Sequence, residues 1–316
     1  MAPVIRAALL RLREEAVAEE CAAGRGLDAW LGGSSGETCV RLHVLRATEL
    51  GLLVQHPPSE TVEQLWSPVL RFQGLGALLC RYHEGPRGEP WRHRYCTRPA
   101  RTRQGYCLAH SRSGKALYEL CAQGVDRVCA EAERLLRGET FTVYMLDYGG
   151  SRAKAGLTQD WRLLWRIAEQ PHVSAAVVAK GLPLTEARRL EKRLGRAAAA
   201  TEGAHARLEE RLRSSTGLAP RLSPAERARR LASLLATNGL RGRFEAYTVE
   251  PRGGYAWPIT APRREPRLLA GRRLRLRDYW GGLLLLEDVE KGENLAVWKR
   301  SLVHRLLEDG EARPPR

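Results

Sequence analysis

Two short apolar runs on either side of a glycine pair form the centre of the most clearly patterned stretch, residues 141–196. The runs cover residues 142–146 and 152–158, and the pair between them is Gly149-Gly150. Glycine readily adopts the positive φ angles that a tight hairpin turn requires. The pattern therefore predicts a β-hairpin with this glycine pair at its turn.

A helix, a third strand and a second helix are predicted after the hairpin. We expect Thr158 to be the N-cap of the first helix, residues 172–179 to form the strand, and Thr185 to be the N-cap of the second helix. Apolar residues recur at helical spacing in both helices. They are Leu164, Trp165 and Ala168 in the first helix, and Ala187, Leu190 and Leu194 in the second.

The N-terminal part shows weaker patterns. Residues 1–36 are interpreted as an amphipathic helix that ends in the loose segment LGGSSGE. Residues 38–45 alternate apolar and polar side chains, which is typical of a half-buried strand, and residues 51–55 are expected to pair with them. Residues 115–137 indicate one or two helices broken near Gly124.

The C-terminal part combines helices with short strands. From Ala197 a charged helix is expected to continue to about residue 212. Ser223 and Glu226 then form a capping box at the start of another helix, which Gly239 ends. Beyond this helix the pattern changes to a period of two. Four strand candidates, residues 243–249, 272–280, 282–289 and 294–300, predict a small β-barrel or curled sheet.

The charge of the chain indicates the kind of partner. Its 316 residues, enough for two or three domains, carry a formal net charge of +16, and the pI is near 10.1. Such a field attracts polyanions, which makes nucleic acid the leading partner and an anionic membrane the lesser one. A codon bias towards Arg, Ala and Leu would also produce part of this positive charge, so charge alone does not identify the partner.

Export and membrane insertion are not expected. The apolar run GGLLLLED is far shorter than the ~20 residues that a membrane-spanning helix needs. Arg6, Arg11 and Arg13 interrupt the apolar N-terminal run, so it does not resemble a secretory signal. Seven cysteines, an odd number, then favour reduced thiols or metal ligands over disulfides. We therefore expect a cytoplasmic protein in which Cys21, Cys39, Cys121 and Cys129 are structural thiols.

Four residues have the spacing of a zinc site. Cys80, Cys96, Cys107 and His110 follow the pattern C-x15-C-x10-C-x2-H, within a region rich in Gly and Pro turns. Zinc prefers four sulfur or nitrogen ligands in a tetrahedron, and such a closed site is structural. The region resembles small zinc knuckles that accompany many nucleic-acid-related proteins. The fourth ligand stays open between His110 and His83, because His83 forms a Cys-x2-His pair with Cys80.

Basic and aromatic residues are interleaved around these cysteines. Arginine contacts phosphate, and aromatic rings stack on unpaired bases, so this region is the leading candidate for a nucleic-acid surface. The alternative is that the aromatic rings form the core of the knuckle itself. A second basic stripe is predicted on the strand RRLRLRD. The candidate contacts are Arg94, Arg98, Arg101 and Arg103 in the knuckle, and Arg273 and Arg275 in the stripe.

Four features of the central stretch stand out together: Tyr144 in the first strand, Lys154-Ala155-Gly156 in the second, Arg166 on the first helix and Glu191 on the second. In this order they resemble the motifs of the GIY-YIG endonuclease superfamily. Tyr144 lies where that family has the Tyr of its first motif, and Lys154-Ala155-Gly156 lies on the second motif. Arg166 follows on the first helix and Glu191 on the second, near the family's helical Arg and its metal-binding Glu. Lys154 replaces the second Tyr, as in divergent members that carry Lys-x-Gly. With the cysteine-rich region before it, the chain also resembles an uncharacterised prokaryotic family known only as a domain of unknown function.

The resemblance implies a phosphodiester-cleaving site. Tyr144 would be the general base, Arg166 would hold the phosphate, Glu191 would bind one Mg²⁺ or Mn²⁺, and Lys154 belongs to the same constellation. Each of them also has an ordinary structural interpretation, as a core residue or a solvated ion pair. Because Lys154 departs from the family pattern, a catalytically inactive nucleic-acid-binding or ribonucleoprotein adaptor with the same fold is the alternative function.

The predicted architecture is an α+β, multidomain chain. We divide it into an N-terminal region, residues 1–70, a zinc knuckle, residues 71–115, a GIY-YIG-like core, residues 116–215, and a helix with a small β-domain, residues 216–316. We expect a structural zinc ion and a protein that binds DNA or RNA. The sequence leaves open whether it cleaves the nucleic acid or only binds it. A protein-interaction scaffold would instead bind polyanions weakly and with little dependence on salt.

Overall fold

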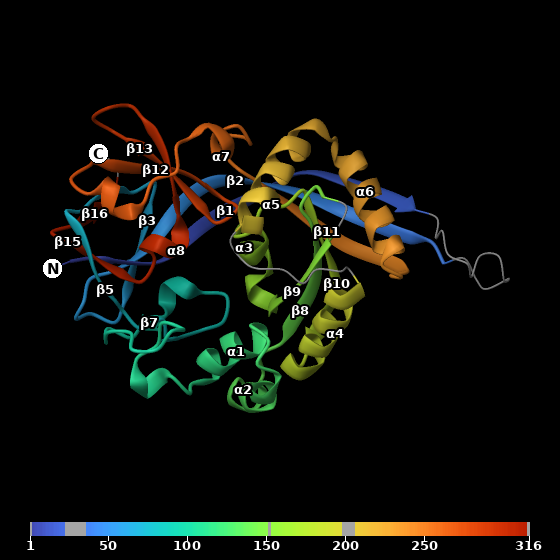
Figure 1. Cartoon of the computed structure of the whole chain (residues 1–316), viewed down its shortest axis with the longest axis horizontal. Coiled ribbons are helices and arrows are strands. Elements are labelled where there is room, and N and C mark those ends of the chain that lie inside the picture. The colour runs from blue at the N-terminus through green and yellow to red at the C-terminus, as the bar shows by residue number, and fades with distance from the viewer. Residues whose placement is uncertain (1, 23–35, 151–152, 198–205, 315–316) are drawn as a thin grey trace.

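The computed structural model describes residues 2–22, 36–150, 153–197 and 206–314, and it has a mixed α+β architecture. Figure 1 shows a long sheet that crosses the molecule, with helices α4 and α6 at one end and the smaller C-terminal sheet at the other. The larger sheet has the strand order β5 (Gly74–Leu78), β15 (Arg305–Glu308), β1 (Val4–Ala22), β2 (Thr38–Gln55), β11 (Gly242–Glu250), β10 (Ser174–Leu182), β8 (Phe141–Asp147) and β9 (Ala153–Gln159), with β3 (Val62–Trp66) also paired to β2.

A five-stranded sheet and a two-stranded ribbon complete the β-structure of the described residues. The five-stranded sheet has the order β14 (Asn294–Trp298), β13 (Leu283–Asp288), β12 (Leu274–Trp280), β4 (Val69–Arg71) and β16 (Glu311–Arg313). The ribbon pairs β6 (His83–Glu84) with β7 (Arg94–Tyr95). Because β4 joins C-terminal strands, this sheet combines distant parts of the chain.

The helices are short, and most cover faces of the larger sheet. α6 packs on β1 and β2, and α4 packs on β8 and β9. None of the described helices is long and apolar enough to cross a membrane. The helices are α1 (Gly114–Ala122), α2 (Cys129–Leu135), α3 (Leu163–Ala168), α4 (Leu184–Ala197), α5 (Ala206–Leu218), α6 (Pro224–Thr237), α7 (Trp257–Thr260) and α8 (Lys299–Leu302), with 3-10 turns at residues 90–92, 108–110, 126–128, 160–162, 219–221 and 266–269.

The N-terminal segment is a strand, so the predicted helix over residues 1–36 is wrong. β1 pairs with β2 along its whole length, from Val4 opposite Gln55 to Ala22 opposite Thr38. Its Ala, Leu, Glu and Arg residues favour helix intrinsically, but the backbone pairing and the burial of Val4 and Ile5 outweigh that preference. The predicted strands at residues 38–45 and 51–55 are parts of one strand, β2, rather than partners of each other. Most of the predicted linker LGGSSGE lies outside the described residues.

The central predictions of strand and helix are confirmed, but both predicted caps are wrong. β8 and β9 form the hairpin, with Gly149 at a φ of 92°, and β10 and the helices α3 and α4 follow. Thr158 stays in β9 opposite Thr142, so the helical turn begins only after it. Thr185 lies inside α4, where its N–H and its hydroxyl both donate to Glu133 Oε2 at 2.7 Å.

The helix break and the capping box predicted from the sequence are also confirmed, whereas part of the charged helix expected up to about residue 212 lies outside the described residues, between the end of α4 at Ala197 and the start of α5 at Ala206. The break near Gly124, which has a φ of 106°, separates α1 from α2. Ser223 and Glu226 form the predicted capping box at the start of α6. All four C-terminal segments are strands, but β11 pairs in parallel with β2 in the larger sheet rather than with β12–β14.

Four cysteines are paired, which corrects the expectation of free structural thiols. Cys21 of β1 and Cys39 of β2 form a cross-strand disulfide, and Cys121 and Cys129 join α1 to α2. The free cysteines of the described residues are the three predicted metal ligands. Sequence spacing alone gave no indication of the first disulfide, because it depends on the β1–β2 register that the helix prediction missed.

Candidate metal centre and basic cavity

Cys80, Cys96, Cys107 and His110 converge into one cluster. Their ligand atoms all lie within 4.8 Å of one another, and the three cysteines are buried. The Nδ1 atom of His110 lies 3.6 Å from the Cys80 sulfur and 3.4 Å from the Cys107 sulfur. With Zn–S near 2.3 Å and Zn–N near 2.0–2.1 Å, a tetrahedral site has a sulfur–nitrogen edge of about 3.6 Å. The donor set and its spacing therefore fit a metal ion such as zinc.

Short turns bring the four ligands together. A 3-10 turn follows Cys107 and ends at His110, whose backbone N–H donates to Cys107 O at 3.0 Å. The β6–β7 ribbon aligns Cys96, whose N–H donates to Tyr82 O at 3.0 Å. The ring of Tyr82 stacks on His110 with ring centroids 3.8 Å apart. These contacts orient the His110 imidazole towards the cysteine sulfur atoms.

His83 does not belong to the cluster. Its ring stacks on His93, with centroids 4.4 Å apart, and its Nδ1 lies 2.8 Å from Lys115 Nζ. Burial and the nearby Lys115 lower the pKa of His83 well below its ordinary value. The question left open by the sequence is therefore answered in favour of His110 as the fourth ligand.

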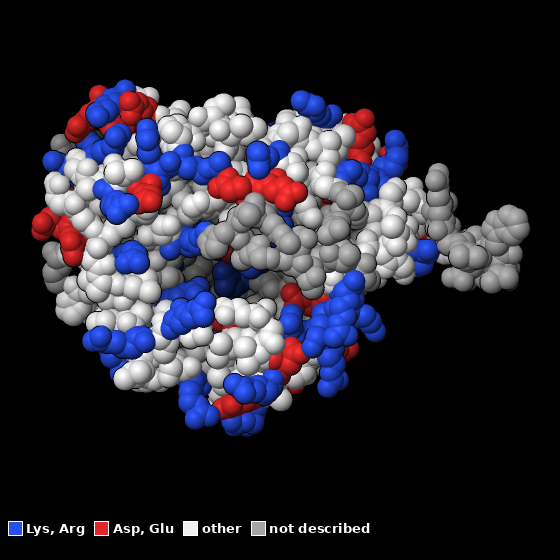
Figure 2. All heavy atoms as spheres, in the orientation of Figure 1, with Lys and Arg blue, Asp and Glu red and all other residues white. Residues whose placement is uncertain are grey.

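A large basic cavity lies between the knuckle, the central hairpin and the C-terminal segment. Its volume is about 1170 Å³, and its lining includes thirteen Lys and Arg residues but only three Glu residues. Figure 2 shows the hollow near the middle of the visible face, with Lys and Arg side chains inside it and beside it. Its walls come from β1, the knuckle, α1, β9, α3, α4, α5 and residues 298–304. The cavity therefore forms only when distant parts of the chain fold together.

Three of the four predicted catalytic residues line this cavity. They are Lys154 on β9, Arg166 on α3 and Glu191 on α4. Tyr144 lies behind them on β8, where its side chain is fully enclosed and the residue is only 1% exposed. Gln170 connects the two groups, since its Nε2 donates to the Tyr144 hydroxyl and its Oε1 accepts from Lys154 Nζ, both at 2.7 Å.

Close packing encloses the phenol ring of Tyr144. Gly156 lies directly opposite Tyr144 in the hairpin, and a Cβ atom there would lie 2.6 Å from both the Cζ and the hydroxyl of the tyrosine. Burial raises the pKa of Tyr144, although Arg166 and Gln170 act in the opposite direction. The hydroxyl is therefore protonated at neutral pH and makes a hydrogen bond within the protein.

Lys154 lines the cavity but forms no ion pair among the residues that the structure describes. Its amine donates to Gln170. Burial, with Arg166 and Arg211 nearby, lowers the pKa of Lys154 to about 7. Glu191 acts in the opposite direction without forming an ion pair with the amine, and a bound phosphate would add a second negative charge beside it, so this amine is suited to anion binding.

Glu169 is the main counter-ion of the cavity and was not identified from the sequence. Its carboxylate contacts Arg166 at 3.1 Å, Lys299 at 2.5 Å and Arg162 at 3.5 Å. Burial acts to raise the pKa of Glu169, but Lys299 and the two arginines outweigh it and lower the pKa. Lys299 follows β14, more than a hundred positions away in sequence, so no local motif could have revealed this group.

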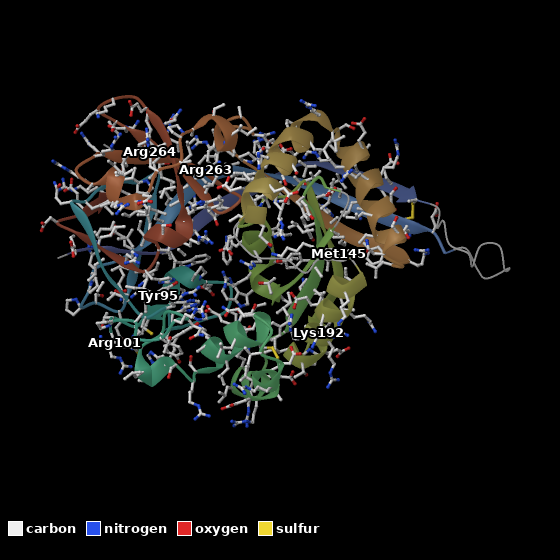
Figure 3. The ribbon with its side chains drawn as sticks, viewed as in Figure 1. Tyr95, Arg101, Met145, Lys192, Arg263 and Arg264 are labelled. Carbon is white, nitrogen blue, oxygen red and sulfur yellow. A yellow bond between two sulfur atoms is a disulfide. The ribbon has the colours of Figure 1, made fainter. Side chains whose placement is uncertain are left out.

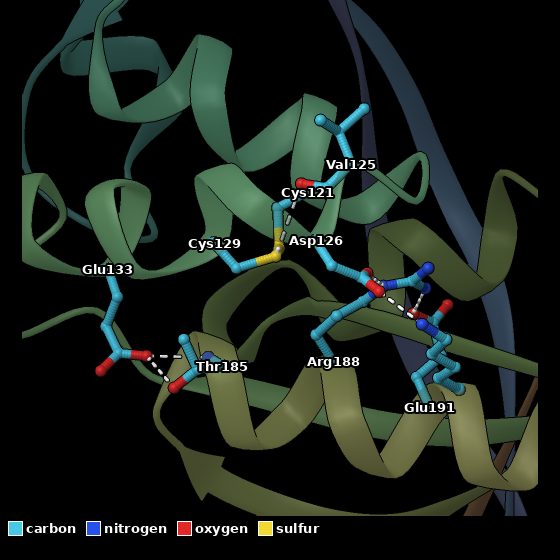
Figure 4. Close-up of a disulfide and its surroundings, with 9 residues drawn as sticks. Cys121, Val125, Asp126, Cys129, Glu133, Thr185, Arg188 and Glu191 are labelled. Atoms are coloured by element: carbon cyan, nitrogen blue, oxygen red, sulfur yellow. Dashed lines mark hydrogen bonds and ion pairs between the residues drawn. A yellow bond between two sulfur atoms is a disulfide. The ribbon is translucent and has the colours of Figure 1, made fainter.

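Glu191 is held by neighbouring charges. Arg188 Nη1 donates to Glu191 Oε2 at 2.5 Å, and Arg188 Nε donates to Asp126 Oδ1 at 3.2 Å. Asp126, which also pairs with Lys192, lies in the loop that the Cys121–Cys129 disulfide closes, as Figure 4 shows. Burial raises the pKa of Glu191, and Arg188 acts in the opposite direction. The ordinary structural role, pairing with Arg188, is thus present in the structure.

The six predicted nucleic-acid contacts do not form one surface. Arg94 pairs with Glu60 at 2.8 Å, and Arg94 and Arg98 line a smaller pocket of about 540 Å³ beside the metal ligands. Arg103 lines the basic cavity, whereas Arg101 is exposed on the knuckle, at the lower left of Figure 3. Arg273 is exposed just before β12, and Arg275 within β12 lies 3.5 Å from Glu287.

The aromatic residues of the knuckle are mostly buried in it. Tyr95 and Tyr106 are 3% and 2% exposed, so their faces are not free to stack on bases. The alternative interpretation, that these rings form the core of the knuckle, is the one that the structure favours. Sequence reasoning instead missed Trp161, Trp165 and Trp298, which line the cavity.

Comparisons with known protein families, with curated proteins and with solved structures found no match for this chain.

Proposed function

We propose that this chain is a zinc-containing nucleic-acid-binding protein that holds a phosphate backbone in its basic cavity. The observation that carries the proposal is the lining of this cavity, in which cations outnumber carboxylates by thirteen to three. A concave, positively charged site concentrates polyanions and releases their counter-ions on binding. The Cys80, Cys96, Cys107 and His110 cluster supports a structural zinc ion, because four protein ligands leave no open position.

Metal-dependent cleavage of the bound strand is the first form of this proposal. The order of β8, β9, α3, β10 and α4 supports a divergent GIY-YIG-like core, and Lys154, Arg166 and Glu191 share one cavity. Glu191 would provide one carboxylate to Mg²⁺ or Mn²⁺, with phosphate and water completing the shell, as is usual for Mg²⁺. The ion would polarise phosphate oxygens, and Arg166 would balance the developing charge.

Binding without cleavage is the second form, and a specific contact favours it. The Tyr144 hydroxyl accepts a hydrogen bond from Gln170 and is enclosed by the hairpin, so it has no direct access to a water molecule in the cavity. Arg188 also occupies the Glu191 carboxylate at 2.5 Å. An adaptor would use Lys154 and Arg166 for phosphate contacts and would leave the strand intact.

One experiment separates the two forms. Zinc-loaded protein is incubated with labelled single- and double-stranded DNA and RNA, with Mg²⁺, with Mn²⁺ or without added cation. Cleavage that is lost in both Tyr144→Phe and Glu191→Ala supports the nuclease, and binding without cleavage under every condition supports the adaptor.

The binding proposal itself is tested by salt dependence and by a matched pair of variants on α5. Arg211 lines the cavity, whereas Arg213 on the same helix is exposed and does not. We expect Arg211→Ser to weaken binding and to reduce the salt slope by about 1, and Arg213→Ser to have a smaller effect. Binding that is weak and independent of salt would contradict the proposal and favour a protein-interaction scaffold.

A further inference from the structure

Two tryptophan side chains, one in the 3-10 turn before α3 and one in α3, give the basic cavity an aromatic surface. Trp161 and Trp165 are half-buried, line the cavity and lie one helical turn apart, with ring centroids separated by 5.8 Å at an angle of 81°. Cations adjoin them, and the Arg162 guanidinium carbon lies 5.8 Å from the Trp161 ring centroid. Aromatic faces beside basic side chains are typical of sites that bind unpaired bases along with phosphates.

The shape of the site restricts the kind of nucleic acid that it can accept. Pockets that enclose drug-sized ligands have about 300–1,000 Å³, and the basic cavity has about 1170 Å³. This volume fits a few nucleotides. In a duplex the base faces stack on one another and only their edges are exposed in the grooves, so Trp161 and Trp165 could not reach them.

We propose that the cavity holds a single-stranded segment of DNA or RNA, with unpaired bases stacked on Trp161 and Trp165 and phosphates placed against Lys154 and Arg211. This inference rests on the proposed function and specifies its substrate. It also moves the base-stacking surface away from the knuckle, where Tyr82 is stacked on His110 and Tyr95 is buried.

The test compares four fluorescent ligands of equal length by anisotropy at fixed salt. They are single-stranded DNA, single-stranded RNA, a DNA duplex, and an abasic strand that keeps every phosphate but has no bases. Wild-type protein is expected to bind the abasic strand about 5- to 150-fold more weakly than at least one of the base-containing single strands, since one stacked base contributes an interaction of this size. The duplex is expected to bind more weakly than that strand. The DNA and RNA arms distinguish the two sources of an unpaired base.

Matched variants locate the stacking surface. Trp161→Leu and Trp165→Leu should weaken binding of the base-containing strand and leave binding of the abasic strand nearly unchanged. Trp66→Leu is the control, because Trp66 is a half-buried tryptophan on β3 that does not line the cavity. Circular dichroism and zinc content establish that each variant folds, and the abasic comparison needs only the wild-type protein.

The outcomes separate this inference from the proposed function. Equal affinity for abasic, duplex and base-containing strands would overturn the single-strand inference, while the basic cavity would still be a polyanion site. Failure to bind any of the four ligands would overturn both.

Discussion

Replacing Lys154 with methionine tests the electrostatics of the cavity directly. The pKa of this amine falls from 10.5 to about 7, chiefly because burial removes water from the charged form. A tenfold change in the protonation equilibrium corresponds to ~1.4 kcal/mol, so this pKa shift means that the charged amine destabilises the folded protein by about 5 kcal/mol. Solvent in the cavity screens part of this cost. We therefore expect Lys154→Met to raise the free energy of unfolding by about 2–3 kcal/mol where the amine is charged.

The sign of the pH dependence follows from the direction of the pKa shift. Between pH 7 and 10.5 the unfolded chain keeps a proton on Lys154 that the folded protein has lost, so the stability contributed by this residue rises with pH in that window. Below pH 7 both states are protonated and the full cost is present. Lys154→Met should therefore be more stable than wild type at pH 6, and this advantage should shrink as the pH approaches 10.

Urea unfolding of both proteins at pH 6, 7.5 and 9 measures the difference in free energy of unfolding. Titrating groups that do not interact with Lys154 contribute equally to wild type and variant, so they cancel in this difference, whereas Glu191, whose pKa Lys154 lowers, does not cancel completely. Lys180→Met is the matched control, because Lys180 is an exposed lysine on β10. A difference between wild type and Lys154→Met that does not change with pH would refute the reasoning.

Three further perturbations have defined outcomes. Elemental analysis should find about one zinc per chain, and Cys107→Ser should lose it, whereas retention of full zinc content would contradict the proposed ligand set. Gly156→Ala should destabilise the fold by about 1–3 kcal/mol in thermal or urea unfolding, because the new methyl group collides with a buried ring, whereas Gly195→Ala, which meets no atom within 4 Å, should not. Cys121→Ser should lower the free energy of unfolding by about 2–3 kcal/mol through the loss of a short closed loop. Because a reductant also opens Cys21–Cys39, wild type and variant should differ little when both are reduced.

Local patterns predicted the central elements because each depends on neighbouring residues. The hairpin needs Gly149 at its turn, the helix α6 needs the Ser223 and Glu226 capping box, and the metal cluster needs four ligands near turns. In each case the information lies within one short segment or in a fixed spacing. The convergence of the cysteines with His110 is therefore the best-supported prediction from the sequence.

Other features depend on contacts that no local pattern encodes. β1 has a helix-forming composition and becomes a strand because β2 is available to pair with it. Glu169 becomes a central counter-ion because Lys299 approaches it at 2.5 Å from the far end of the chain. The basic cavity likewise exists only between segments that tertiary folding brings together, so its tryptophan lining could not be recognised in the sequence.

The metal cluster and the larger sheet are joined through one buried guanidinium. Arg6 of β1 is 2% exposed, and it donates to Cys80 O at 3.0 Å, to Cys96 O at 2.7 Å and to Gln55 Oε1 at 2.6 Å. A buried charge is tolerated only while such partners stay in place, and removing them costs several kcal/mol (~3–5). The two carbonyl groups belong to ligand residues, so their positions depend on the geometry of the cluster. Since Arg6 also lines the basic cavity, a metal held by this cluster would fix one wall of the cavity as well as the knuckle.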